Sequence, residues 1–199
     1  MIFRRLKLTI LLFFVSVSLA GAFQVPDTGI TECYDADGNL IVPCPAPGEA
    51  YFGQDGNLVQ QKSMDYTDNG DGTVTDTVTG LLWQKVADGT ARNWADAGTY
   101  CSGLDLGSHS SGWKLPVLVQ FETLLDLSVD TELDPAAVAM NSIFNGAEGA
   151  VVYWTATEDA GNPYNGTDNA WIMNFNLAED DTAAKSGANY VRCVWEVIQ

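Results

Sequence analysis

Four cysteines constrain this chain more than any other feature: Cys33, Cys44, Cys101 and Cys193. Their even number in a chain that opens like an exported protein predicts two disulfides, with three possible pairings. Cys33 and Cys44 flank Asp37-Gly38, a strong hairpin signal, which favours a local bridge between them. Cys101 would then pair with Cys193 across a long loop. A zinc site is disfavoured, because the chain has no CxxC pair and its single histidine is His109.

The first 22 residues have the pattern of a signal peptide. A basic start reaches Lys7, residues 8–19 form an apolar run, and Ala20-Gly21-Ala22 supplies a small-x-small cleavage pattern. The run is too short to span a bilayer comfortably, so no membrane anchor is expected in the mature chain. We expect the mature protein to begin at Phe23 and to be secreted or held at the cell surface, with the periplasm as the alternative compartment.

The charge of the mature chain excludes one class of partner. Three of the 9 basic residues lie in the first seven positions, so the mature chain would carry 6 basic and 26 acidic residues, a net charge of −20. Nucleic-acid binding depends on cations that neutralise phosphates, so this class is excluded. The same charge argues against docking on anionic membranes. The simplest interpretation of this negative charge is that it keeps the protein soluble.

The mature chain divides into two regions. Residues 23–62 are rich in Pro, Gly and Asp and predict an N-terminal arm that contains the Cys33–Cys44 hairpin. Residues 63–199 predict a domain with a β-meander over 66–84 and helices that begin after Asn93 and after Pro116. A third short helix is expected at Asp134-Pro135. Strands are expected over 151–157, 170–175 and 190–197. This order of elements indicates an α+β domain.

Several motifs resemble those of the Lcl C-terminal domain family, over about residues 62–197. They are Asp68-Asn69-Gly70-Asp71-Gly72, Thr79-Gly80-Leu81-Leu82-Trp83-Gln84, Trp94-Ala95-Asp96-Ala97, Gly112-Trp113-Lys114-Leu115-Pro116, Tyr153-Trp154-Thr155-Ala156-Thr157 and Tyr190-Val191-Arg192-Cys193-Val194. The family is similar to the C-type-lectin-like fold of the formylglycine-generating enzymes. The resemblance therefore implies a C-type-lectin-like fold with short antiparallel strands, two to three helices and two disulfides.

The chain departs from the family in its charge. The best-known representative is a collagen-like adhesin that binds sulfated glycosaminoglycans, whereas this chain has no Gly-X-Y tract. Lys114 replaces the usual Arg before Leu-Pro, and Trp195 stands where a basic residue is common. A protein of net charge −20 with six scattered cations should repel such polyanions, so glycosaminoglycan binding is not expected.

An acidic turn is the candidate metal site. Asp68, Asn69, Asp71 and Asp76, together with Thr75, place oxygen ligands around two glycines, as calcium loops do. The spacing does not match an EF-hand, because the glutamate at the twelfth position is missing. The alternative is a tight β-turn in which the glycines supply positive φ. Calcium is the one cofactor that the sequence suggests.

A polar loop between two predicted strands is the candidate ligand site. Its members are Glu158, Asp159, Asn162, Tyr164, Asn165, Asp168 and Asn169. The comparable loop of C-type-lectin-like folds often carries ligand contacts, which is an argument from fold analogy. Trp154 and Trp171 could stack on a sugar, but their apolar strands favour packing in the core. Tyr164 is the better surface candidate.

The sequence favours an exported, non-enzymatic binding or adhesion module for a glycan or a protein. His109 lies among loop residues without a nucleophile signature, so no catalytic residue is assigned. One alternative is a structural subunit of a surface or periplasmic assembly whose arm packs on a neighbour. A small periplasmic enzyme is the least favoured alternative.

Overall fold

The computed structural model describes residues 26–57, 63–131, 134, 136–144, 152–161 and 168–196. The predicted signal peptide and three candidate loop residues, Asn162, Tyr164 and Asn165, lie outside these ranges. Both predicted disulfides are confirmed: Cys33 pairs with Cys44, and Cys101 pairs with Cys193.

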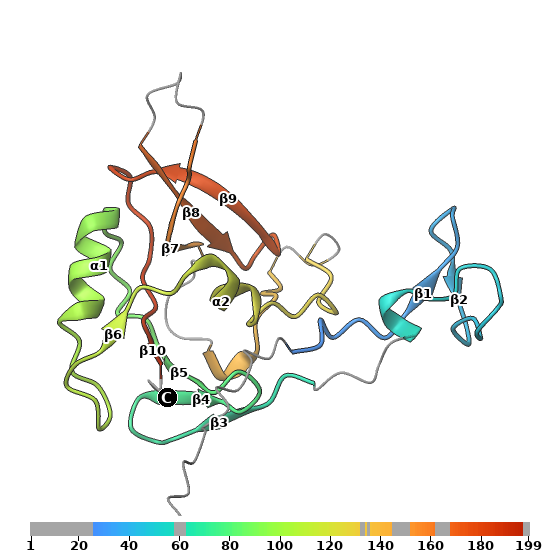
Figure 1. The fold of residues 1–199 in the computed structure, drawn as a ribbon, viewed down its shortest axis with the longest axis horizontal. Coiled ribbons are helices and arrows are strands. Elements are labelled where there is room, and N and C mark those ends of the chain that lie inside the picture. Colours follow the sequence, from blue (N-terminus) through green and yellow to red (C-terminus); the bar gives the residue numbers. More distant parts are fainter. Residues whose placement is uncertain are drawn as a thin grey trace, which may run out of the picture.

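The lower layer of the domain in Figure 1 is an antiparallel sheet of five short strands. Its order is β3 (Tyr66–Asp68), β4 (Thr73–Asp76), β5 (Leu81–Gln84), β10 (Val194–Glu196) and β6 (Trp113–Lys114). The predicted meander forms its first three strands. Gly70 and Gly72 in the β3–β4 turn have φ of 75° and 89°, which L side chains rarely adopt. β10, the last strand among the described residues, lies inside the sheet between β5 and β6.

The upper layer is a three-stranded antiparallel sheet of β7 (Val152–Glu158), β8 (Asn169–Asn174) and β9 (Glu179–Ala184). The first two match predicted strands. The third strand was missed by the sequence analysis, because Glu179-Asp180-Asp181 has low β-propensity. These three acids are exposed on an edge strand, where charge discourages pairing with other chains.

Two α-helices complete the domain: α1 (Trp94–Ser102) and α2 (Leu118–Glu122). The predicted N-cap of α1 is confirmed, since the Asn93 side chain accepts a hydrogen bond from the Asp96 amide at 2.9 Å. The side-chain Nδ2 of Asn93 also donates a hydrogen bond to the Asp96 carboxylate at 2.7 Å. Both bonds define where the helix begins.

Replacing Asn93 with Ala should lower the free energy of unfolding by about 1 kcal/mol, because the Asp96 amide loses its acceptor. Urea unfolding followed by tryptophan fluorescence would measure this change. Asn93→Ser keeps a side-chain acceptor and should recover most of the loss. Equal stability of the Ala and Ser variants would contradict the capping role.

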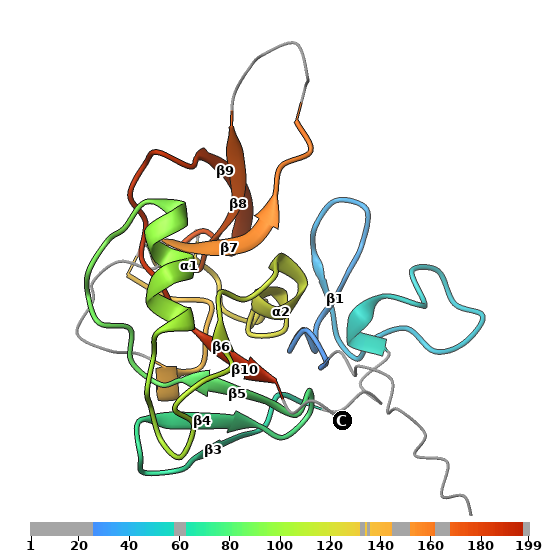
Figure 2. The ribbon, with the colours of Figure 1, turned by 60° about the vertical axis from the view of Figure 1, so that its left-hand side comes forward.

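The hydrophobic core lies in two clusters on either side of the C-terminal strand. The first joins the two sheets through α2, which lies between them in Figures 1 and 2. Its members include Trp83, Phe121, Tyr153, Phe175 and Val194, all nearly inaccessible to solvent. The second cluster packs α1 onto β6 and β7 around the Cys101–Cys193 bridge. The disulfide therefore lies inside the core.

The N-terminal arm lies to one side of this body (Figure 1). It holds a two-stranded sheet of β1 (Cys33–Tyr34) and β2 (Leu40–Ile41) and a 3₁₀ helix, Asp55–Asn57. Its first residues reach the domain, where the carbonyl of Thr28 accepts a hydrogen bond from the Leu127 amide at 2.9 Å.

Two details of the predicted domain were wrong or incomplete. The expected strand over 190–197 begins only at Val194, because Tyr190 instead forms a parallel bridge with Tyr153 of β7. Asp134 and Ala136 are not helical, and Pro135 lies outside the described residues. The short helix of this region is instead the 3₁₀ helix Ser142–Phe144.

Candidate functional site

A single lysine joins the two ends of the β7–β8 connection. The Lys185 ammonium lies 2.8 Å from the Glu158 carboxylate at the end of β7 and 2.5 Å from the Asp168 carboxylate before β8. These hydrogen bonds, to Asp168 first and Glu158 second, raise the pKa of Lys185. The lysine side chain is 15% exposed, whereas both carboxylates lie largely in solvent. Lys185 therefore links the two ends of this loop through ion pairs.

The N-terminus of α1 supports the same lysine. The Lys185 ammonium lies 4.6 Å from the centroid of the Trp94 ring, a cation–π contact. The Trp94 indole in turn donates to the carbonyl of Thr155 in β7 at 2.8 Å. The Trp94 amide donates to the Lys185 carbonyl at 3.0 Å. We call Glu158, Asp168, Lys185 and Trp94 the loop-root cluster.

The structure brings together only some of the predicted ligand residues. Glu158 and Asp168 meet through Lys185, and Asn169 begins β8 opposite Ala184. The Asp159 amide donates to the Asn169 carbonyl at 3.1 Å, and its carboxylate accepts from the Gly161 amide. Sequence reasoning missed Lys185 because it lies 17 residues beyond Asp168. The strand pairing of β8 with β9 places it there.

The two tryptophans of β7 and β8, Trp154 and Trp171, differ in burial. Trp154 is fully buried in the second core cluster, as predicted. Trp171 is half-buried and belongs to neither core cluster, so the expectation that it packs in the core was wrong. It lies in β8 two residues from Asn169, beside Thr182 of β9. Because side chains alternate along a strand, Trp171 lies on the opposite face of β8 from Ala170 and Ile172, which join the second core cluster, and it keeps some accessible surface there.

The predicted metal residues are not all in one place. Asp68, Asn69 and Asp71 lie in the β3–β4 turn, but Asp76 lies at the opposite end of β4 and is 1% exposed. There its carboxylate accepts from the Val78 and Thr79 amides and closes the β4–β5 turn. The four residues therefore do not form the single site that the sequence suggested.

The remaining turn residues make protein contacts. Asp71 accepts hydrogen bonds from the amide and hydroxyl of Thr73, and these lower its pKa. Asp68 accepts from the Gly70 amide and pairs with Lys85 at 2.6 Å. Within the described ranges, no group of three or more His, Cys, Asp or Glu side chains could hold a metal ion. Calcium binding stays a prediction.

Every lysine and arginine in the described part of the chain is either paired with a carboxylate or buried. Lys85 pairs with Asp68, Arg92 with Asp88, and Lys114 with Glu196. Lys185 belongs to the loop-root cluster, and Arg192 is fully buried. None of the lysines and arginines in the described ranges is therefore both exposed and unpaired. That polyanionic glycans are not ligands stays a prediction.

The single histidine stacks on an aromatic ring. The His109 ring centroid lies 4.0 Å from that of Trp195, and the His109 carbonyl accepts from the Trp113 indole at 3.0 Å. His109 is half-buried. Its contacts are those of a residue that packs the α1–β6 loop onto β10.

Comparisons with known proteins place the domain. No curated protein sequence matches the chain. A chain from a solved structure of a mutant von Willebrand factor A1 domain with botrocetin is similar, with a TM-score of 0.36 and 10% identity over 67% of this chain and 97% of that one. No helix among residues with a described structure could span a membrane. The Lcl C-terminal domain family matches residues 72–195, more than half of the sequence. The chain therefore belongs to the Lcl C-terminal domain family.

Proposed function

We propose that this protein is an exported, non-catalytic binding module that recognises a neutral glycan at the loop end of β8. Export is supported by the signal-peptide pattern of the first 22 residues and by two disulfides, which persist in oxidising compartments. The observation that carries the proposal is the half-buried Trp171 ring near the polar end of β8.

The chemistry of this region suits sugars without charge. Amide and carboxylate side chains bind sugar hydroxyls, and an aromatic face covers the apolar face of a pyranose ring. Asp168, Asn169 and the loop residues Tyr164 and Asn165 supply these groups. Sulfated or sialylated glycans are disfavoured, because the cation nearest to the loop, Lys185, already pairs with two carboxylates.

Binding of the purified protein to arrays of neutral oligosaccharides and heparin fragments tests this function. We expect binding to a neutral glycan and no detectable binding to heparin. Trp171→Ala should weaken that binding by roughly tenfold or more, the loss expected for one stacked ring. Tyr164→Ala tests the loop without changing the half-buried tryptophan.

Leu177→Ala is the matched control, because Leu177 is 58% exposed in the β8–β9 turn at the far end of the same sheet. It should bind like the original protein. Absence of binding to every neutral glycan, or full binding by both aromatic variants, would overturn the proposal. Repeating the titration in chelator tests the calcium prediction: calcium assistance requires that the affinity fall, whereas unchanged affinity excludes it.

A further inference from the structure

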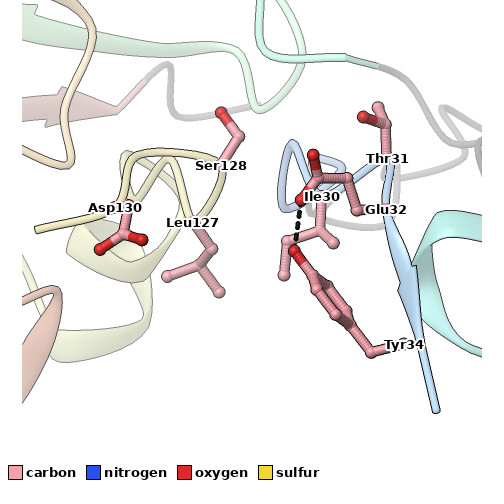
Figure 3. A pocket seen from close by; sticks show the side chains of 7 residues that line it. All are labelled: Ile30, Thr31, Glu32, Tyr34, Leu127, Ser128 and Asp130. Atoms are coloured by element: carbon pink, nitrogen blue, oxygen red, sulfur yellow. Dashed lines mark hydrogen bonds between the residues drawn. The ribbon is translucent and has the colours of Figure 1, made fainter. Parts of the chain in front are cut away.

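A cleft separates the N-terminal arm from the domain (Figure 3). Its volume is about 280 Å³. The arm contributes Ile30, Thr31, Glu32 and Tyr34, and the segment after α2 contributes Leu127, Ser128 and Asp130. A second cleft of about 230 Å³ shares Thr31 and Ser128 with it and adds Asp27 and Asp126. The hollow therefore follows the junction of arm and domain.

The walls of this cleft are both apolar and acidic. Tyr34 and Leu127, on opposite walls, are each 40% exposed. Glu32 lies on the arm side, where it accepts a hydrogen bond from the Tyr34 hydroxyl, and Asp130 lies on the domain side. The hydrogen bond to Glu32, with the charges of Glu32 and Asp130, raises the pKa of Tyr34. The two carboxylates create a negative potential in a cleft whose walls also carry Ile30 and Leu127.

The apolar surface continues from the cleft onto the arm. Tyr34 pairs across the β1–β2 ladder with Leu40, which is 52% exposed. Gln54 bonds the backbone carbonyls of both Tyr34 and Tyr51, so Tyr51, 48% exposed, lies close to Tyr34. Phe52 and Val42 are exposed on the same arm. Tyr34 and Leu40 thus form an exposed apolar pair, and contiguous exposed apolar side chains commonly mark an interaction surface.

The negative charge of the arm indicates which kind of partner can bind this surface. Residues 26–57 contain six acids and neither lysine nor arginine; the acids are Asp27, Glu32, Asp35, Asp37, Glu49 and Asp55. A second copy would bring the same acidic surface and the same large net charge, so self-association would be opposed by repulsion. A basic partner with apolar side chains would be attracted and would cover the exposed rings.

We propose that the arm–domain cleft docks a cationic, apolar segment of another exported protein. An arginine or lysine of the segment enters between Glu32 and Asp130, and a neighbouring apolar side chain covers Tyr34 and Leu40. This surface involves different residues from the glycan site, so either proposal can fail without the other.

Fluorescence anisotropy with a labelled peptide of about ten alternating arginine and leucine residues tests the docking surface, at about 0.1 M salt to screen distant charges. The double variant Glu32→Gln/Asp130→Asn should raise the dissociation constant at least tenfold. Both side chains are exposed, and urea unfolding of the variant checks that the fold is unchanged. Tyr34→Ala/Leu40→Ala should weaken binding to a similar degree.

The matched control removes two charges elsewhere: Glu179→Gln/Asp180→Asn changes exposed acids of β9. It should alter the dissociation constant less than twofold. An equal loss in both acid variants would show general attraction to an acidic protein and would overturn the proposal. A peptide of alternating glutamate and leucine that binds equally well would do the same. Sedimentation showing a dimer that Tyr34→Ala/Leu40→Ala dissociates would assign the surface to a second copy instead.

Discussion

Arg192→Met is expected to lower the free energy of unfolding by about 3–5 kcal/mol, the usual cost of removing one side of a buried polar network. Arg192 is fully buried, and its guanidinium donates to neutral oxygens of three different segments. It bonds the carbonyl of Gln84 at the end of β5 and that of Lys85 just after it, the carbonyl of Phe144 at 2.9 Å and the Tyr153 hydroxyl at 3.3 Å. Methionine would fill much of the volume and leave these acceptors without donors.

Urea unfolding with both disulfides intact would measure this effect, which corresponds to a fall in Tm of roughly 10 °C for a protein of this size. Arg192→Lys keeps the charge but not the planar fork, so it cannot reach both the Gln84 and Phe144 carbonyls and should also be destabilised. A methionine variant as stable as the original protein would contradict the prediction. It would mean that desolvation of the guanidinium offsets its hydrogen bonds.

Removing the Cys101–Cys193 bridge by a double substitution to Ala is expected to cost about 4–5 kcal/mol in the chain-entropy model of disulfides. The bridge closes a loop of 92 residues, and both cysteines are fully buried. It fastens α1 to the segment that enters β10, so the second core cluster would lose a cross-link as well as two packed sulfur atoms. Urea unfolding of the oxidised double variant would measure the loss.

The Cys33–Cys44 bridge is the natural control, since it spans 11 residues and lies in the arm. Its removal should cost about 3 kcal/mol of arm stability in the same model. The unfolding midpoint of the domain, reported by the buried Trp83 and Trp154, should change little. A larger effect on this midpoint from the arm bridge than from Cys101–Cys193 would contradict the assignment of the core disulfide.

Local sequence signals predicted much of the fold. Asn93 with Asp96 marked the start of α1, and the glycines of the β3–β4 turn marked the meander. Both signals work because a cap or a positive φ depends only on residues that are adjacent in sequence. The short strand β6 and the acidic strand β9 were not predicted, because their strand conformation depends on partners that are distant in sequence.

The candidate sites were less predictable than the fold. Glu158 and Asp168 were chosen as ligand residues from their loop, but Lys185, which holds both, was not. Asp76 was grouped with Asp71 because five positions separate them, although the extended strand β4 places them at opposite ends. Sequence proximity indicates spatial proximity in a turn and fails along a strand, where each residue advances the chain by about 3.3 Å.

The sequence alone indicated the local Cys33–Cys44 bridge, the helix start, the acidic character and the family of this chain, because each depends on residue type and local spacing. The tertiary structure decided which charges are used and which surfaces remain open. Arg192 donates hydrogen bonds in the core, and Lys185 pairs with carboxylates at both ends of a loop, only because strands distant in sequence lie together. The arm–domain cleft likewise exists only where two regions of the chain meet. Burial and long-range pairing are properties of the folded chain, so no local pattern could report them.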